Sequence, residues 1–305
     1  PLESAKSIAV IGAHARFGRG QGGGSATVYP TEFVAPLEGL TSNAPTGTSI
    51  QYTLGVNADT GLIQFDKNYL KNPVTGTGGC LAEVVAPDGS ILLSENRFGG
   101  FFNWATQPWM FQYKFIRVSG VFTADKDGEY QFGVGMVGNY KVTIGDAVHE
   151  GFIPMHSDDL GEFVLNPPCR SFGHTLRKGE EVLLQWEYPQ GSLPIPIASF
   201  LIGFREPSRS QAEEFSDATA LAAKSDVAIV FVGTTAEIES EGHDRKDISL
   251  PDGQDQLVSA VAKVAKRTIV VVNAGSPVEM PWFDEVDSVL FTYFGGQQMG
   301  SALAD

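Results

Sequence analysis

The hydrophobic pattern of the chain changes twice, near residue 61 and again near residue 206. Outside these two points, continuous apolar runs alternate with stretches of helical periodicity. Between them, helical periodicity is absent and short alternating segments are separated by turn dipeptides such as Asp127-Gly128. The pattern therefore predicts one discontinuous α/β domain, residues 1–61 and 206–305, interrupted by an all-β domain, residues 62–205.

The outer segments repeat strand–loop–helix units. The apolar runs that predict central parallel strands are Ser7–Ile11, Asp226–Val232, Thr268–Val272 and Ser288–Tyr293. The predicted helices are Thr31–Leu40, Gln211–Lys224 and Asp255–Lys266. Units of this length imply right-handed crossovers, so we expect a doubly wound, mostly parallel sheet in a three-layer sandwich. For the middle segment we expect an antiparallel sandwich or barrel.

Charge and composition exclude several classes of partner. A formal net charge of −15 argues against nucleic acid and against an anionic membrane surface. The sequence contains no apolar run of about 18 residues and no basic-then-apolar start, so it predicts neither a membrane span nor a signal peptide. It also lacks an N-x-[ST] sequon, which favours a cytoplasmic protein. Its two cysteines, Cys80 and Cys169, lack metal-site spacing, and their pairing stays open.

The loop after the Asp226–Val232 run is rich in acidic residues. Glu237, Glu239 and Glu241 stand at alternate positions, directly before Gly242, His243, Asp244 and Arg245. Open α/β sheets keep their binding and catalytic groups at the carboxyl ends of their strands. Like charges at this spacing repel unless a cation or a substrate offsets them. The uncompensated charge therefore indicates a functional loop.

Several ordered motifs resemble one enzyme family. They are SIAVIGAHA, GGGSATVYP, SEGHDR, SLPDGQDQLVSAV, NAGSPVEMPW and FGGQQMGSALAD. Together they resemble the C-terminal α/β domain of glycoside hydrolase family 3 β-glucosidases, over about residues 5–56 and 206–305. The resemblance implies that Glu241 is the general acid/base and that the nucleophile is an aspartate on an N-terminal barrel domain. The middle segment resembles a PA14 domain, a module often inserted in sugar-active enzymes.

The chain cannot supply both catalytic carboxylates. Glu239 is the fallback for the acid, with Glu237 a further rival. In an extended loop Glu239 and Glu241 lie about 6.6 Å apart on one face, whereas acid and nucleophile approach a sugar ring from opposite faces. No barrel-length sequence is present, so we expect the chain to be a fragment that is inactive alone. In the assembled site we expect a raised pKa for Glu241, because only the protonated form donates.

Four further residues are candidates for substrate contact. His243 is a candidate hydrogen-bonding partner for sugar or a second base. Phe101, Phe102 and Trp104 belong to an aromatic-rich stretch of which most should be core. If any ring of this stretch is exposed, we expect it to be Phe101, Phe102 or Trp104, because the glycines of FGGFFNW are typical of a protruding loop. Asp244 and Arg245 should hold the acidic loop in shape by a charge-assisted contact.

No cofactor or metal is predicted. The glycine-rich segment Gly18–Gly24 has no G-x-G-x-x-G that opens a helix in the required spacing and no G-K-[ST] after it, so we interpret it as packing against the missing barrel domain. Asp158-Asp159 lacks identifiable further oxygen ligands.

The predicted function is part of a retaining β-glucosidase acting on terminal non-reducing β-linked glucosyl residues. Its expected partners are a β-glucoside or oligosaccharide and the barrel domain, while sugar identity and homo-oligomer formation stay open. The alternatives are a non-catalytic, PA14 lectin-like glycan-binding module and a nucleotide-binding α/β protein.

Overall fold

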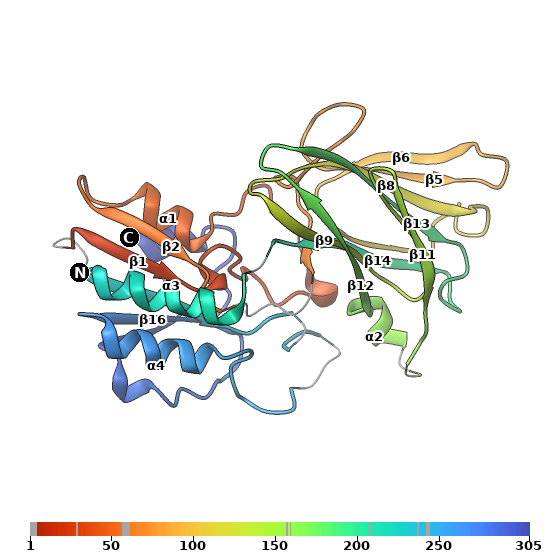
Figure 1. Cartoon of the computed structure of the whole chain (residues 1–305). Coiled ribbons are helices and arrows are strands. Elements are labelled where there is room, and N and C mark those ends of the chain that lie inside the picture. Colours follow the sequence, from red (N-terminus) through yellow and green to blue (C-terminus); the bar gives the residue numbers. More distant parts are fainter. Residues whose placement is uncertain are drawn as a thin grey trace. The chain divides into compact units, whose positions relative to one another are not determined.

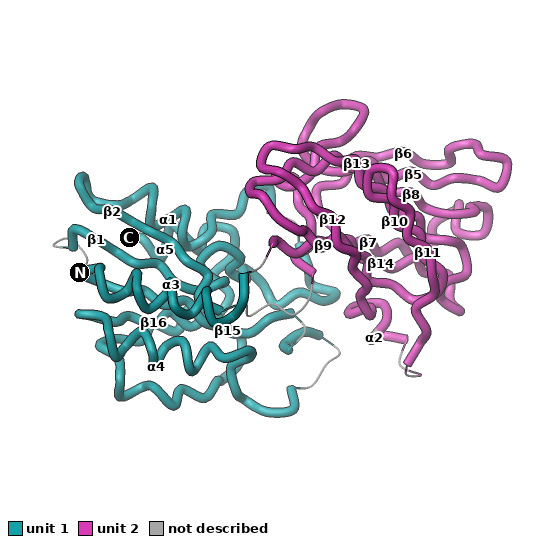
Figure 2. Tube along the Cα trace, viewed as in Figure 1, with its two compact units in different colours: residues 1–60, 209–305 teal, residues 61–208 magenta. Residues whose placement is uncertain are grey.

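The computed structural model describes residues 5–28, 30–56, 62–156, 158, 160–207, 209–236, 238–241 and 245–305. The chain divides into two compact units, Pro1–Thr60 with Arg209–Asp305, and Gly61–Ser208 (Figures 1 and 2). The first unit contains the parallel sheet and most of the helices. Within the described ranges, no helix combines the length and the apolar character needed to cross a membrane.

The first unit is built on a five-stranded sheet whose pairings are all parallel. Its spatial order is β17 (Ser288–Phe291), β16 (Thr268–Asn273), β15 (Val227–Gly233), β1 (Ser7–Ile11) and β2 (Ser49–Thr53). All seven residues of β15 are buried, as expected of a β-branched run at the centre of a parallel sheet. The sequence therefore located the central strands by their unbroken apolar character.

Helices cover both faces of this sheet (Figure 1). Alternate residues of β15 point to opposite sides, so Val230 packs with α3 (Gln211–Lys224) and α4 (Gln254–Val264). Phe231 belongs to the opposite face, with side chains of α1 (Pro36–Ser42) and α5 (Met299–Ala304). Helix α3 begins at a capping box formed by Ser210 and Glu213. The sheet and its two helical coverings make three layers.

The predicted helix Thr31–Leu40 is wrong at its start. Helix α1 begins at Pro36, and Ala35 before it is extended, with φ −68° and ψ 154°. Proline favours the first helical position and pushes the preceding residue out of the helical region. The apolar spacing upstream of Pro36 therefore did not produce a helical turn.

The second unit contains two antiparallel sheets. The larger has the order β11-β10-β13-β8-β5-β6 with β4 beside β8, and the smaller has β12-β9-β14-β3 with β7 beside β14. The bounds are β3 Ile63–Gln64, β4 Leu70–Lys71, β5 Cys80–Val85, β6 Ile91–Arg97, β7 Phe101–Ala105, β8 Phe115–Thr123, β9 Gly128–Gly135, β10 Gly138–Ile144, β11 Ala147–Ile153, β12 Cys169–Leu176, β13 Glu181–Pro189 and β14 Ile197–Arg205. One short helix, α2 (Leu160–Leu165), lies between β11 and β12.

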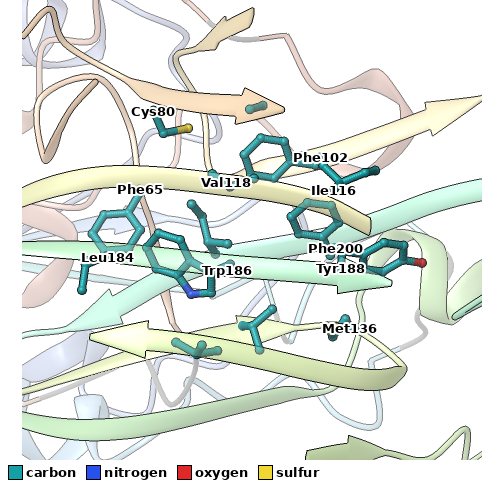
Figure 3. Close-up of a cluster of buried hydrophobic side chains, with 14 of the residues drawn as sticks. Phe65, Cys80, Phe102, Ile116, Val118, Met136, Leu184, Trp186, Tyr188 and Phe200 are labelled. Carbon is teal, nitrogen blue, oxygen red and sulfur yellow. The ribbon is translucent and has the colours of Figure 1, made fainter. Parts of the chain in front are cut away.

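Aromatic side chains from both sheets fill the core of the second unit (Figure 3). Phe102 stacks on Phe200 with ring centroids 4.7 Å apart. Trp186 is buried against Phe65, and its Nε1 donates to the carbonyl of Gly133 at 3.0 Å. A buried tryptophan needs such an acceptor, because an unpaired N–H in an apolar core is destabilising.

The cysteines are not joined. Cys80 lies in the aromatic core as a free thiol, and burial raises its pKa to about 12. A thiol of this kind behaves as a small apolar side chain.

The segment FGGFFNW is a strand and not a protruding loop. Its last four residues, with Ala105, form β7, which pairs with β14 so that Phe102 faces Phe200 and Trp104 faces Ala198. Gly100 precedes it at a close backbone approach, where a Cβ would lie 2.6 Å from the carbonyl oxygen of Ile202. The glycines therefore mark tight packing beside a strand.

We predict a large effect for one phenylalanine of the aromatic-rich stretch and a negligible effect for another. Phe102→Ala should lower the free energy of unfolding of the second unit by about 3–5 kcal/mol, because a fully buried ring is lost. Phe111→Ala should change it by less than about 0.5 kcal/mol, because that ring is 78% exposed. Urea denaturation followed by tryptophan fluorescence measures both, and equal effects would contradict the burial described here.

His14 is a buried titratable group at the end of β1. It lies in the short 3₁₀ helix Ala13–Ala15, and its Nδ1 is 3.3 Å from Oδ1 of Asn273. Burial lowers the pKa of His14 to about 4, against the opposing effect of its hydrogen bond to Asn273. The folded state therefore holds a neutral imidazole over a range in which the unfolded chain is protonated.

This shift predicts a pH-dependent stability. The contribution of His14 is complete above its unfolded pKa of 6.5 and is lost as pH falls from there to about 4. The full loss in the free energy of unfolding is about 3 kcal/mol. Native-state hydrogen exchange of the β15 and β16 amides, corrected for intrinsic rates, measures it. In His14→Gln the free energy of unfolding should depend less steeply on pH over this range. An unchanged dependence in the variant would contradict the assignment.

A second group provides an internal control. Lys266, with the backbone N–H of Lys6, lowers the pKa of Asp226 to about 2. Its stability contribution is therefore lost only as pH falls below about 4. That lower-pH loss should persist in His14→Gln.

Candidate functional site

The site forms where the order of the parallel strands reverses direction. Strand β2 follows β1 on one side, whereas β15, β16 and β17 extend from β1 on the other side. The connections after β1 and β15 therefore lead to helices on opposite faces of the sheet. Ligands of open α/β sheets bind at such a switch point, outside the carboxyl ends of the strands. Both the glycine-rich loop and the acidic loop begin there.

Glu239 is held inside the acidic loop. Its Oε2 accepts from Thr234 Oγ1 at 2.5 Å and from the backbone N–H of Gly275 at 3.1 Å. Burial acts to raise the pKa of Glu239, but hydrogen bonds from Ser276, Thr234 and Gly275, with the charge of Arg19, outweigh it and lower the pKa. This carboxylate connects the loop after β15 to the loop after β16.

Arg19 joins the glycine-rich loop to the acidic loop. Its Nη2 donates at 2.9 Å to both Gly22 O and Glu239 O, and its Nη1 donates to Thr235 O at 3.1 Å. The guanidinium also lies 4.7 Å from the ring centroid of Phe294. A planar group with several fixed donors is well suited to this bridging role.

Asn273 fixes the base of the same loops. It ends β16, is fully buried, and its Oδ1 accepts from the backbone N–H of Arg19 at 2.7 Å. Its Nδ2 donates to Arg19 O at 3.1 Å and to Tyr293 O at 2.6 Å. One side-chain amide thus holds the connections that follow β1 and β17.

Glu241 is exposed, and its described partner is Ser25. The Glu241 carboxylate accepts from the backbone N–H of Ser25 at 2.5 Å and from Ser25 Oγ at 2.9 Å. The hydroxyl, followed by the backbone N–H, lowers the pKa of Glu241 below its ordinary value. This direction is opposite to the raised pKa expected for the assembled site, so the unit by itself favours the carboxylate form.

Gly24 permits this contact. A Cβ at Gly24 would lie 2.4 Å from both Cβ and Oε2 of Glu241, and the φ of Gly24 is +69°. Any other residue would clash and adopt a strained backbone. The glycine-rich loop was expected to pack against another domain, but at this point it packs against the acidic loop of its own unit.

Arg245 stabilises the far end of the acidic loop. Its Nη1 donates at 3.0 Å to Ser276 Oγ and to Pro277 O. Asp244, its expected partner, lies outside the described residues, as do Glu237, His243 and Asp159.

The expectation that Phe102 and Trp104 are exposed was wrong. Phe102 is 0% exposed and Trp104 is 7% exposed, so neither presents a face to a sugar. Their alternation in β7 directs both side chains into the core. Phe101 points the other way and is half-buried, while the strongly exposed rings nearby are Phe98 and Phe111.

Sequence reasoning missed Ser25, Arg19 and Asn273. The glycine-rich loop carried a signal for Ser25, since GGGS lies in the connection that follows the first strand. Among the described residues, no group of three or more His, Cys, Asp or Glu side chains could hold a metal ion.

Comparison with known proteins identifies the family. The whole chain, residues 1–305, matches the Glycosyl hydrolase family 3 C-terminal domain. It is 29% identical to a probable beta-glucosidase I of Emericella nidulans, over 100% of this chain and 38% of that protein. It is 28% identical to a beta-glucosidase of Kluyveromyces marxianus, over 97% of this chain and 37% of that protein.

A solved structure supports the same relationship. The crystal structure of the Kluyveromyces marxianus beta-glucosidase in complex with glucose matches with a TM-score of 0.84 and 25% identity, over 99% of this chain and 37% of that one. The chain thus spans less than two fifths of the length of these relatives. It belongs to glycosyl hydrolase family 3 and corresponds to the C-terminal domain of that family.

Proposed function

We propose that this chain supplies the general acid/base, Glu241, of a retaining β-glucosidase that removes terminal non-reducing β-linked glucosyl residues. Membership of the family and the beta-glucosidase names of the relatives support hydrolysis of a glycosidic bond. The proposal concerns the complete enzyme, because the chain spans only part of those relatives.

The contrast between the two described carboxylates of the acidic loop carries this proposal. Glu239 is occupied by Thr234 and Gly275, so its charge is already used to hold the loop. Glu241 is exposed at the switch point, and the described residues include no cation paired with it. A catalytic acid must reach substrate, and of this pair only Glu241 is exposed.

The chemistry requires a second carboxylate that approaches the other face of the sugar. We assign it to an aspartate on an N-terminal barrel domain of the same polypeptide, about 5–5.5 Å from Glu241. In the first step, protonated Glu241 gives its proton to the glycosidic oxygen, the bond from C1 to that oxygen breaks, and the aspartate bonds to C1. In the second step, ionised Glu241 takes a proton from water, the water oxygen bonds to C1, and the bond to the aspartate breaks.

The acid step requires the pKa of Glu241 to rise when the complete site forms. Desolvation by the substrate and repulsion from the aspartate charge both act in that direction. The hydrogen bonds from Ser25 act against it and favour the form needed for the second step. The surroundings of Glu241 therefore have to stabilise its protonated form in the first step and its ionised form in the second.

We also propose a role for the β-rich unit. Residues 62–205 would be a PA14-like module that contacts the sugar substrate through Phe101, the half-buried residue that begins β7. His243, outside the described residues, is proposed as a hydrogen-bonding partner of the sugar.

The acid role predicts a dependence on the leaving group. In the complete enzyme, Glu241→Gln should lower kcat/KM for poorly activated glycosides by about 10³-fold, because general acid catalysis is lost. Activated aryl glycosides should lose far less, since their leaving groups need no proton. Steady-state kinetics on a series of aryl glucosides measures this, and equal losses across the series would contradict the role.

Glu239→Gln is the matched control. Because Glu239 holds the loop rather than the proton, its loss should affect all leaving groups alike and should lower thermal stability. A leaving-group dependence in Glu239→Gln, without one in Glu241→Gln, would move the acid role to Glu239.

The missing nucleophile predicts that residues 1–305 alone are inactive. An assay of the purified chain with an aryl β-glucoside should show no turnover above the rate of the Glu241→Gln chain. Turnover that depends on Glu241 would contradict the need for a second domain.

A further inference from the structure

We propose that Ser25 is the positioning residue of Glu241, which fixes Oε2 as a permanent hydrogen-bond acceptor and leaves Oε1 as the oxygen that gains and loses the proton. The inference rests on the acid/base role proposed for Glu241. It adds a residue from the loop after β1, 216 positions away in the sequence, to the catalytic machinery.

The two donors of Ser25 differ in what they allow. The backbone N–H of Ser25 faces Oε2 and can only donate, so a proton on Oε2 would point at another hydrogen. The hydroxyl faces Oε1, and a hydroxyl both donates and accepts. When Glu241 is ionised, the hydroxyl donates to Oε1. When Glu241 is protonated, the proton is on Oε1. The hydroxyl then rotates so that its oxygen accepts a hydrogen bond from this proton, or it turns away so that the proton can pass to the substrate.

The loop that carries Ser25 is held on both sides. The Gln21 side chain donates to Val28 O at 2.7 Å and accepts from Val28 N at 3.0 Å, which closes the loop around Ser25. Arg19 connects the same loop to the acidic loop through Gly22 O and Glu239 O, both at 2.9 Å. Ser25 is therefore positioned before substrate arrives, as a residue that orients a catalytic group must be.

No other described charge competes with Ser25 for control of Glu241. The Glu239 carboxylate is directed to Thr234 and Gly275, the Arg19 guanidinium to backbone carbonyls and Phe294, and the Arg245 guanidinium to Ser276 and Pro277. Glu237, His243 and Asp244 lie outside the described residues. Among the described residues, Ser25 supplies the hydrogen bonds that lower the pKa of Glu241, against desolvation.

A titration of this chain tests the contact directly. With ¹³C-labelled glutamate and the Glu241 carboxyl resonance assigned from Glu241→Gln, Ser25→Ala should raise the pKa of Glu241, and Ser25→Thr should restore it. Ser301→Ala is a matched control, because its hydroxyl also donates at 2.9 Å to a side-chain oxygen, that of Gln298, but in α5. An unchanged Glu241 titration in Ser25→Ala would overturn the inference.

The pH profile of the complete enzyme tests the consequence for catalysis. The basic limb of kcat/KM reports loss of the proton from the acid. Ser25→Ala should move this limb to higher pH and lower the plateau roughly fivefold, the effect of about one hydrogen bond. Ser25→Thr should restore both. A plateau loss with an unmoved limb would show that Ser25 is only structural.

A double variant separates this inference from the proposed function. On activated aryl glucosides, adding Ser25→Ala to Glu241→Gln should cause no further loss, because Gln carries no titrating proton. A further fivefold loss would overturn the inference while leaving the acid role intact. Equal losses of Glu241→Gln across the leaving-group series would remove the acid role and this inference together.

Discussion

The candidate site depends on two neighbouring parallel strands, β1 and β15, whose connections lead to opposite faces of the sheet. The loops after these strands start side by side and can meet only above the carboxyl edge. There Ser25 from one loop binds Glu241 from the other. The Glu241 carboxylate thereby has a hydrogen-bonding partner that is 216 positions away in the sequence.

Charge repulsion in the acidic loop is resolved by giving each described carboxylate its own donors. Glu239 receives hydrogen bonds from Thr234 and Gly275, which fix it to the strand ends. Glu241 receives them from Ser25 at an exposed position. Hydrogen bonds to an ionised oxygen favour the charged form. Both described carboxylates are therefore held in the charged form, and Glu241 remains exposed.

The sequence predicted what depends on local pattern. The unbroken apolar residues of β15 identified a strand buried on both faces, and the acidic residues after it lie at the carboxyl edge of the sheet, where the candidate site is placed. It failed where one residue type has two structural uses. The glycines before Phe101 suggested a loop but permit a close backbone approach beside β7, and Pro36 starts α1 later than the apolar spacing implied. Ser25 was missed because its contact with Glu241 arises only from tertiary structure.

The most direct test is the distance between the Glu241 carboxyl group and a second carboxylate in a crystal structure of the complete enzyme with glucose bound. For a retaining mechanism we expect about 5–5.5 Å between the two groups, on opposite sides of the sugar C1. A nearest second carboxylate about 10 Å or more from Glu241, or a different carboxyl group beside the glycosidic oxygen, would contradict the assignment of Glu241 as the acid.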